Sequence, residues 1–207
     1  MTTTTAVIQE GSSISDEAGL ILASRQGDQK AFNQLVLHYQ DRIYNLAVRI
    51  LGDEDSAGDI TQNTFLTAYL KLAGFRNGSF RSWLYRIATN ACYDVHRLHK
   101  RHPVLSIDDK ELAEEKLFPL DDYSVASGLP EREFEKREIE QIIQHALNQL
   151  DIRQRTLVIL VDQQELDYKE AAKILGIPVG TVKSRLARAR LRLRQLLSHS
   201  QEALILT

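Results

Sequence analysis

The sequence predicts an all-α protein in which two small helical domains are joined by an acidic linker. Apolar residues recur at intervals of three and four through most of the chain, whereas alternating stretches bounded by turn residues are few. The helical pattern lapses over residues 103–131, where eight acidic residues accompany two lysines, as is typical of an interdomain linker. We therefore expect a tail at 1–15, a domain at 16–102, a linker at 103–130, a second domain at 131–197 and a tail at 198–207.

Four helices are expected in the first domain, and glycine marks the breaks between the long ones. Gly52 and the stretch 74–79 interrupt the helical spacing of apolar residues. The predicted helices cover residues 16–25, 29–51, 53–72 and 80–101.

The helix at 53–72 carries an acidic and polar face, and apolar residues fill the adjacent sector. Such a face suits docking of a basic partner. The alternative is an acidic first turn favoured by the helix dipole, which accounts for Asp53, Glu54 and Asp55 but not for Asp59. The residues at i, i+4, i+7 and i+11 of this stripe are Asp55, Asp59, Gln62 and Leu66, and the adjacent sector holds Ile60, Thr64, Phe65 and Ala68.

The helix at 80–101 and the loop before it interleave aromatic and cationic residues. Aromatic rings among cations can stack unpaired bases inside an electrostatic groove. The alternative is core packing, because Trp83, Ile87 and Ala91 are spaced four apart. The side-chain amide of Asn90 can recognise a base edge or hydrogen-bond near the helix surface. The aromatic and basic set is Phe75, Arg76, Phe80, Arg81, Trp83, Tyr85, Arg86, Tyr93, Arg97, Lys100 and Arg101.

The last quarter of the chain has the pattern of a helix-turn-helix. Ala171, Ala172 and Leu175 lie at helical spacing, Gly176 suits the positive φ after a helix, and Pro178 suits a first helical turn. The next helix carries six Lys or Arg and no carboxylate over residues 179–197, which favours phosphate contacts. A solvated basic helix is the alternative. The apolar stripe of the helix at 179–197 consists of Val182, Leu186, Ala189 and Leu193. The neighbouring polar face consists of Thr181, Ser184, Arg185, Arg188 and Arg192.

The composition is that of an ordinary soluble protein. Of the 207 residues, 43% are apolar and 26% charged, with a formal net charge of -2. The single cysteine, Cys92, excludes an intrachain disulfide and a cysteine-rich zinc site. An apolar run of about 18 residues and a signal-like start are both missing from the sequence. We expect a cytoplasmic protein with no direct membrane insertion, no metal and no other cofactor.

Four ordered motifs occur in the chain, at residues 27–39, 59–65, 80–90 and 178–190. Together with the acidic linker they resemble the bacterial sigma factors of RNA polymerase, specifically the small extracytoplasmic-function class of the sigma-70 family. The resemblance implies a region 2 domain and a region 4 helix-turn-helix domain. It further implies an alternative sigma factor that binds core RNA polymerase, recognises the -35 and -10 elements of promoter DNA and assists melting. An anti-sigma factor is the expected further partner.

The resemblance also implies roles for particular residues. In this family the helix matching residues 53–72 docks on the coiled coil of the largest polymerase subunit, the segment matching 75–101 melts and recognises the -10 element, and the helix-turn-helix recognises the -35 element. The core-polymerase candidates are Asp55, Asp59, Gln62 and Phe65. The -10 candidates are Phe75, Arg76, Phe80, Trp83 and Asn90, and the -35 candidates are Thr181, Lys183, Ser184, Arg185 and Arg188.

Two other functions compete with this interpretation. An autonomous helix-turn-helix regulator would bind an operator without polymerase, and it would need a second copy to span two half-sites. A metal-dependent enzyme would use the carboxylates near residue 55, but only Asp55 and Asp59 can converge on one helical face. We therefore expect no catalytic residue in this chain.

Overall fold

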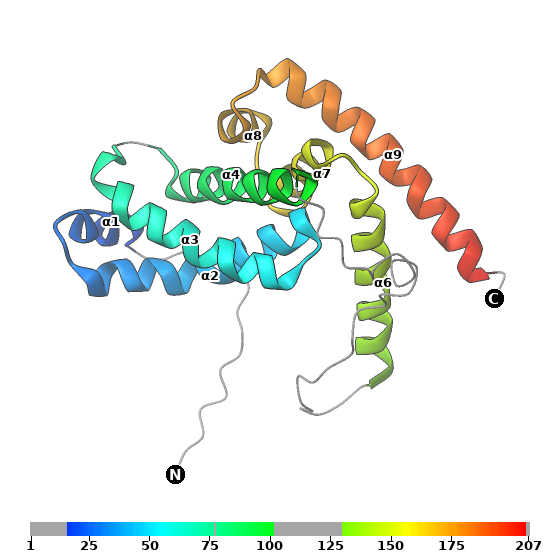
Figure 1. Cartoon of the computed structure of the whole chain (residues 1–207), viewed down its shortest axis with the longest axis horizontal. Helices are drawn as coiled ribbons and strands as arrows, with labels where there is room; N and C mark the ends of the chain where they lie inside the picture. The colour runs from blue at the N-terminus through cyan, green and yellow to red at the C-terminus, as the bar shows by residue number, and fades with distance from the viewer. Residues whose placement is uncertain (1–15, 77, 102–129, 206–207) are drawn as a thin grey trace, which may run out of the picture.

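The computed structural model describes residues 16–76, 78–101 and 130–205, and it confirms the all-α fold class. Within these ranges no strand forms, and no helix is both long and apolar enough to cross a membrane. The first predicted tail and residues 103–129 of the predicted linker lie outside the described residues. The helices, labelled as in Figure 1, are α1 (Glu17–Arg25), α2 (Gln29–Leu51), α3 (Glu54–Lys71), α4 (Phe80–Arg101), α6 (Pro130–Asn148), α7 (Ile152–Val158), α8 (Tyr168–Leu175) and α9 (Val179–Ile205), with a 3-10 turn η1 (Leu72–Gly74) and a π-helical turn η2 (Ile159–Gln163).

Local capping interactions set the bounds of the helices in the first unit, α1–α4. The Asp28 carboxylate accepts a hydrogen bond from the Lys30 amide at 2.8 Å at the start of α2. Asp53 accepts one from the Ser56 amide at 3.1 Å at the start of α3. Gly52 ends α2 with a φ of 74°, in the left-handed region that favours glycine. Because these signals are local, the four predicted helices agree with the observed ones to within one residue at each end.

The core of the first unit lies between α2, α3 and α4. Leu35, Ile43 and Leu46 of α2 are fully buried, and Ile60 of α3 and Leu84 of α4 pack in the same apolar cluster. Burial of these side chains is the main stabilising contribution to the unit, since each large aliphatic side chain contributes about 1.5–3 kcal/mol. This core fixes which faces of α3 and α4 remain exposed.

The second unit consists of α6, α7, η2, α8 and α9. Asp167 caps α8 by accepting hydrogen bonds from the amides of Lys169 and Glu170 at 2.7 and 2.8 Å. Gly176 ends α8 with a φ of 64°, as the helix-turn-helix pattern predicts. The predicted apolar stripe of α9 is confirmed, because Val182, Leu186 and Ala189 are buried and Leu193 packs against them. Helix α6 begins at Pro130, one residue before the predicted domain boundary.

The two units pack against each other along a seam that the sequence does not reveal. In Figure 1, α8 lies beside α4, and α6 and α7 lie beside the carboxyl end of α2. Four buried side chains of the second unit belong to the same apolar cluster as the core of α2–α4. These side chains are Ile159, Leu160, Leu166 and Ile174.

Candidate functional site

The acidic face predicted for α3 is exposed and borders a hollow lined by apolar and polar side chains. Asp55, Asp59 and Gln62 are exposed, and Leu66 exposes 56% of its surface on the same face. The hollow measures about 530 Å³ and lies between α2 and α3. Phe65 is buried, with 7% of its surface exposed, so it forms part of the wall of the hollow rather than projecting from it. The lining residues are Gln29, Phe32, Asn33, Gln62, Asn63, Phe65, Leu66 and Tyr69.

One acid of this helix has a structural function instead. The Asp53 carboxylate caps α3, and its hydrogen bonds with Ser56 hold its pKa below the ordinary value. The first-turn explanation therefore holds for Asp53 at the cap and for Glu54 and Asp55 in the first turn, whereas Asp59 lies beyond that turn. The exposed carboxylates that α3 offers to a partner are those of Glu54, Asp55 and Asp59.

The aromatic residues before and within α4 divide into a buried anchor and a half-exposed pair. The rings of Phe75, Phe80 and Trp83 form a triangle with centroid separations of 5.1 to 5.6 Å. Phe80 exposes only 1% of its surface and also packs on Tyr39 with a centroid separation of 5.7 Å. Phe75 and Trp83 are half-buried, so they both pack on the core and present ring surface to solvent. Core packing and a ring surface open to a stacked base are therefore compatible for Trp83.

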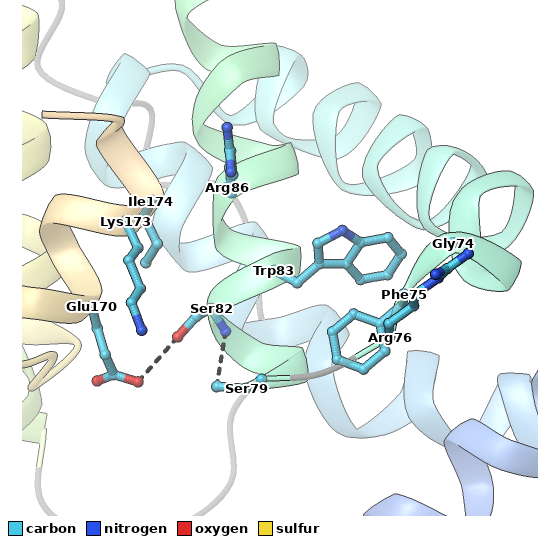
Figure 2. Close-up of a pocket in the computed structure, with 11 residues that line it drawn as sticks. Gly74, Phe75, Arg76, Ser79, Ser82, Trp83, Arg86, Glu170, Lys173 and Ile174 are labelled. Atoms are coloured by element: carbon cyan, nitrogen blue, oxygen red, sulfur yellow. Dashed lines mark hydrogen bonds between the residues drawn. The ribbon is translucent and has the colours of Figure 1, made fainter.

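This aromatic pair lines a cavity of about 560 Å³, shown in Figure 2. Cations stand beside the rings, because Arg76 and Arg86 line the same cavity. Stacking surface next to guanidinium groups is the combination that holds unpaired nucleic acid. Asn90 is exposed two turns further along α4 and does not line this cavity.

Helix α8 forms the opposite wall of this cavity, with Glu170, Lys173 and Ile174 (Figure 2). Glu170 accepts a hydrogen bond from the Ser82 hydroxyl at 3.1 Å across the seam. The Ser82 amide donates to the Ser79 hydroxyl at 3.1 Å, which caps the start of α4. The candidate nucleic-acid surface of the first unit is therefore partly covered by the second unit.

The predicted polar face of α9 is largely exposed. Lys183, Ser184 and Arg188 are exposed, while Thr181 and Arg185 are half-buried. A recognition helix enters the major groove with its first turns, where these five residues lie. Arg190 differs from these residues because it forms a bidentate ion pair with Asp162, which raises its pKa through the hydrogen bonds.

Sequence reasoning missed the residues that join the two units. Arg155 exposes only 9% of its surface, and its guanidinium donates to the Ile50 carbonyl at 2.7 Å and to the Asn148 carbonyl at 2.7 Å. Tyr85, with 1% exposed, donates to the Gln164 side chain at 2.6 Å. No local pattern marks these residues, because the partners of Arg155 and Tyr85 across the seam lie 105 and 79 positions away in sequence.

The fold and its surfaces define a class of protein: an all-α, DNA-binding transcription factor with a helix-turn-helix in one unit and an aromatic and basic surface on the other. Two family descriptions match the chain, "Sigma-70 region 2" over residues 35–102 and "Sigma-70, region 4" over residues 140–193. The chain belongs to the sigma-70 family of RNA polymerase sigma factors, in its extracytoplasmic-function (ECF) class. The resemblance predicted from the four motifs is thereby confirmed.

Individual relatives support the same assignment. The chain is 38% identical over 172 residues to the ECF RNA polymerase sigma factor SigW of Bacillus subtilis, covering 83% of this chain and 91% of that protein. It is 37% identical over 173 residues to the RNA polymerase sigma-H factor of Pseudomonas aeruginosa, covering 83% and 88%. Its function is that of an alternative sigma factor directing promoter-specific transcription, so an autonomous regulator is set aside.

Two solved structures share the fold. CnrH in complex with the cytosolic domain of CnrY is similar with a TM-score of 0.64 and 26% identity, covering 89% of this chain and 99% of that one. The sigma factor RpoE in complex with the anti-sigma factor NepR, from Bartonella quintana, has a TM-score of 0.59 and 29% identity, covering 82% and 98%.

Proposed function

We propose that this sigma factor binds core RNA polymerase through the exposed face of α3 and the hollow beside it. The observation that carries the proposal is the alignment of Asp55, Asp59 and Gln62 on one exposed face, which borders a hollow lined by apolar and polar side chains. A partner helix with basic residues beside apolar ones would complement both parts of this surface. Phe65 supports the surface from below through the wall of the hollow.

The -10 element is bound by the aromatic and basic surface of the first unit. Phe75 and Trp83 offer ring faces to an unstacked base, and Arg76 offers a phosphate contact. Each stacked base contributes about 1–3 kcal/mol, which offsets part of the free energy of opening the duplex. Phe80 acts indirectly by holding Phe75 and Trp83 in place, and Asn90 contacts DNA further along α4.

The -35 element is bound by the first turns of α9 in the major groove. Lys183 and Arg188 neutralise phosphates, while Ser184 and Arg185 reach base edges and Thr181 lies at the groove entrance. Buried Val182 and Leu186 fix the rotation of α9, so this face points away from the unit's core. The chain supplies promoter specificity, and the polymerase performs the phosphoryl transfer.

An anti-sigma factor is part of the proposed function. The Bartonella quintana sigma factor of similar fold was solved in complex with such a partner. A partner of this kind would act by competing with the polymerase or with DNA for the exposed surfaces of the two units. Copurification of the chain with an inhibitory protein from its native host would support this part of the proposal, and full transcriptional activity in that host with no bound inhibitor would oppose it.

The decisive experiment measures the affinity of the full chain for bacterial core RNA polymerase. Asp59→Arg reverses a charge at the centre of the exposed face, and we expect at least about a tenfold weaker affinity. Gln62→Ala should weaken binding about three- to tenfold. Glu138→Arg makes the same charge reversal on an exposed position of α6 and serves as the matched control. Equal affinities for Asp59→Arg and the control would refute the proposed docking face.

A further inference from the structure

An ion pair ties the flank of α9 to the rest of the second unit. The guanidinium of Arg190 donates to the Asp162 carboxylate from Nε at 3.1 Å and from Nη2 through a second hydrogen bond, so the pair is bidentate. The side chains are 48% exposed for Arg190 and 32% exposed for Asp162. A bidentate pair fixes the plane of the guanidinium as well as its distance, which a single hydrogen bond does not.

Asp162 lies in the π-helical turn η2, which is anchored in the core. The Gln164 amide donates to the Ile159 carbonyl at 2.9 Å, which is the i→i+5 spacing of a π-helix. Ile159 and Leu160 in the same turn are fully buried. Turns of this kind are rare and occur frequently at functional sites. The Asp162 carboxylate is therefore presented to α9 from a turn that is itself held in place.

Tyr168, the first residue of α8, takes part in the same contact. The hydrogen bonds with Asp162 raise the pKa of Arg190, and an interaction with the Tyr168 side chain raises it further. Arg190 of α9 thus meets both η2 and the start of α8. This one guanidinium connects the three elements that form the helix-turn-helix and its approach.

The ion pair lies away from the DNA-binding face of α9. Arg188 and Arg190 are two positions apart, so on a helix of 3.6 residues per turn their side chains project about 200° apart. The buried stripe with Val182 and Leu186 packs α9 on the unit. Apolar packing is non-directional, whereas hydrogen bonds are directional. The ion pair therefore restricts rotation and sliding of α9 that the apolar stripe alone would allow.

We propose that Asp162 and Arg190 are positioning residues for recognition of the -35 element: their ion pair holds α9 against η2 and α8, so that the DNA-binding face meets base edges in one register. This inference rests on the proposed function, since it concerns the same face of α9. Recognition of base edges requires exact geometry, whereas phosphate contacts carry no sequence information. Loss of the pair should therefore lower discrimination between sequences more than it lowers affinity for DNA as such.

The test uses the holoenzyme assembled from the full chain and core polymerase. The unaltered holoenzyme first selects its preferred duplex from a library randomised over the -35 element. The measured quantity is the specificity ratio, which is the affinity for the selected duplex divided by that for the same duplex with this element scrambled. Asp162→Asn and Arg190→Gln should each lower the ratio at least about fivefold, which corresponds to one good base contact.

Glu165→Gln is the matched control for Asp162→Asn. It makes the same change from acid to amide at an exposed position of the loop that follows η2. We expect this variant to leave the specificity ratio unchanged. An equal fall of the ratio in Glu165→Gln and Asp162→Asn would overturn the proposal, because the loss would then not depend on the ion pair.

The affinity for the scrambled duplex separates positioning from charge. Asp162→Asn removes an acid and releases a cation, so it should raise this affinity, whereas Arg190→Gln removes a cation and should lower it, each by up to about threefold. A purely electrostatic role would change the affinities for both duplexes together and leave their ratio unchanged. Partial unfolding would lower both affinities by the same factor. Only positioning lowers the ratio in both variants while the scrambled duplex responds in opposite directions.

The double variant Asp162→Asn/Arg190→Gln tests whether the two residues act as a unit. It should lower the ratio no further than either single variant does. Additive losses, or an unchanged ratio in the single variants, would overturn the proposal. Arg190→Lys keeps the charge but not the planar fork, so it should give an intermediate ratio. It replaces Arg190→Gln if that variant loses its helical circular dichroism signal, and an unchanged ratio would then count against the proposal.

The outcomes for the two hypotheses differ. Suppose that Arg188→Ala weakens DNA binding while the variants of the ion pair keep the unaltered ratio: the positioning role is then wrong and the proposed function stands. A holoenzyme that prefers no sequence at the -35 element would refute the proposed function of α9, and the positioning role with it.

Discussion

Arg155 gives the most direct test of how the two units are held together. Its side chain is buried, and its guanidinium donates to the carbonyls of Ile50 and Asn148 at 2.7 Å and of Leu150 at 3.5 Å. Burial also lowers the pKa of Arg155 from its ordinary value, because loss of water disfavours the charged guanidinium. The guanidinium therefore links the carboxyl ends of α2 and α6.

Arg155→Ala should lower the free energy of unfolding by about 2–4 kcal/mol. A hydrogen bond from a charged donor contributes about 1.5–3 kcal/mol, and two good ones are lost, while removal of a buried charge offsets part of that loss. In a chain of this size the melting temperature should fall by about 5–15 °C. Urea unfolding followed by circular dichroism measures the change directly.

Two companion variants sharpen this test. Arg153→Ala removes an exposed arginine two residues earlier on the same helix and should change the free energy of unfolding by less than about 0.5 kcal/mol. Arg155→Lys keeps the charge but loses the planar fork that reaches two carbonyls, so it should recover less than half of the loss. If Arg155→Ala costs no more than Arg153→Ala, the bridge described above does not stabilise the folded chain.

Three further measurements follow from the structure. Gly52→Ala should lower the free energy of unfolding by about 2 kcal/mol and Gly176→Ala by about 1 kcal/mol, because both positions need a positive φ. The loss is larger at Gly52 because only there would the added Cβ come within 2.8 Å of another side chain. Equal losses in urea unfolding would contradict this reasoning. For binding to nonspecific duplex DNA, Arg188→Ala should reduce the slope of log affinity against log salt concentration by about 0.9. Arg190→Ala should reduce this slope less, because Arg190 is already paired with the Asp162 carboxylate. A larger reduction for Arg190→Ala than for Arg188→Ala would exclude the proposed DNA-binding face of α9. Burial and then a hydrogen bond to a carboxylate raise the pKa of Tyr39 above its ordinary value of 10.0, so its contribution to stability is fully present below pH 10 and is lost at higher pH. The Tyr39→Phe variant should show a smaller loss of stability between pH 9 and about pH 11 than the unaltered chain, and identical pH profiles would count against this cause.

Much of the fold could be predicted because its signals are local. Asp53 and Gly52 mark helix ends through contacts within four residues, and Gly176 marks the turn of the helix-turn-helix in the same way. The apolar stripe of α9 and the exposed face of α3 follow from helical periodicity alone. Helices α6 and α7 were not assigned individually, and the π-helical turn η2 has no pattern that distinguishes it from an ordinary helix.

The candidate site was predicted in its residue types but only partly in its geometry. The sequence indicated that Phe75, Phe80 and Trp83 act together, and the structure brings their rings into one cluster. It did not indicate that Phe80 would be buried while the other two remain half-exposed. That division depends on where Tyr39 of α2 lies, which is a contact between distant segments.

By itself, the sequence determined the helical fold class, the ends of most helices, the exposed faces of α3 and α9 and the membership of the sigma-70 family. All of these depend on spacing and capping over a few residues, which the order of amino acids specifies directly. Only the tertiary structure decided that Arg155 and Tyr85 join the two units and that α8 covers the aromatic surface of α4. Such contacts link residues about 80 to 105 positions apart, and their formation depends on how complete helices pack against each other.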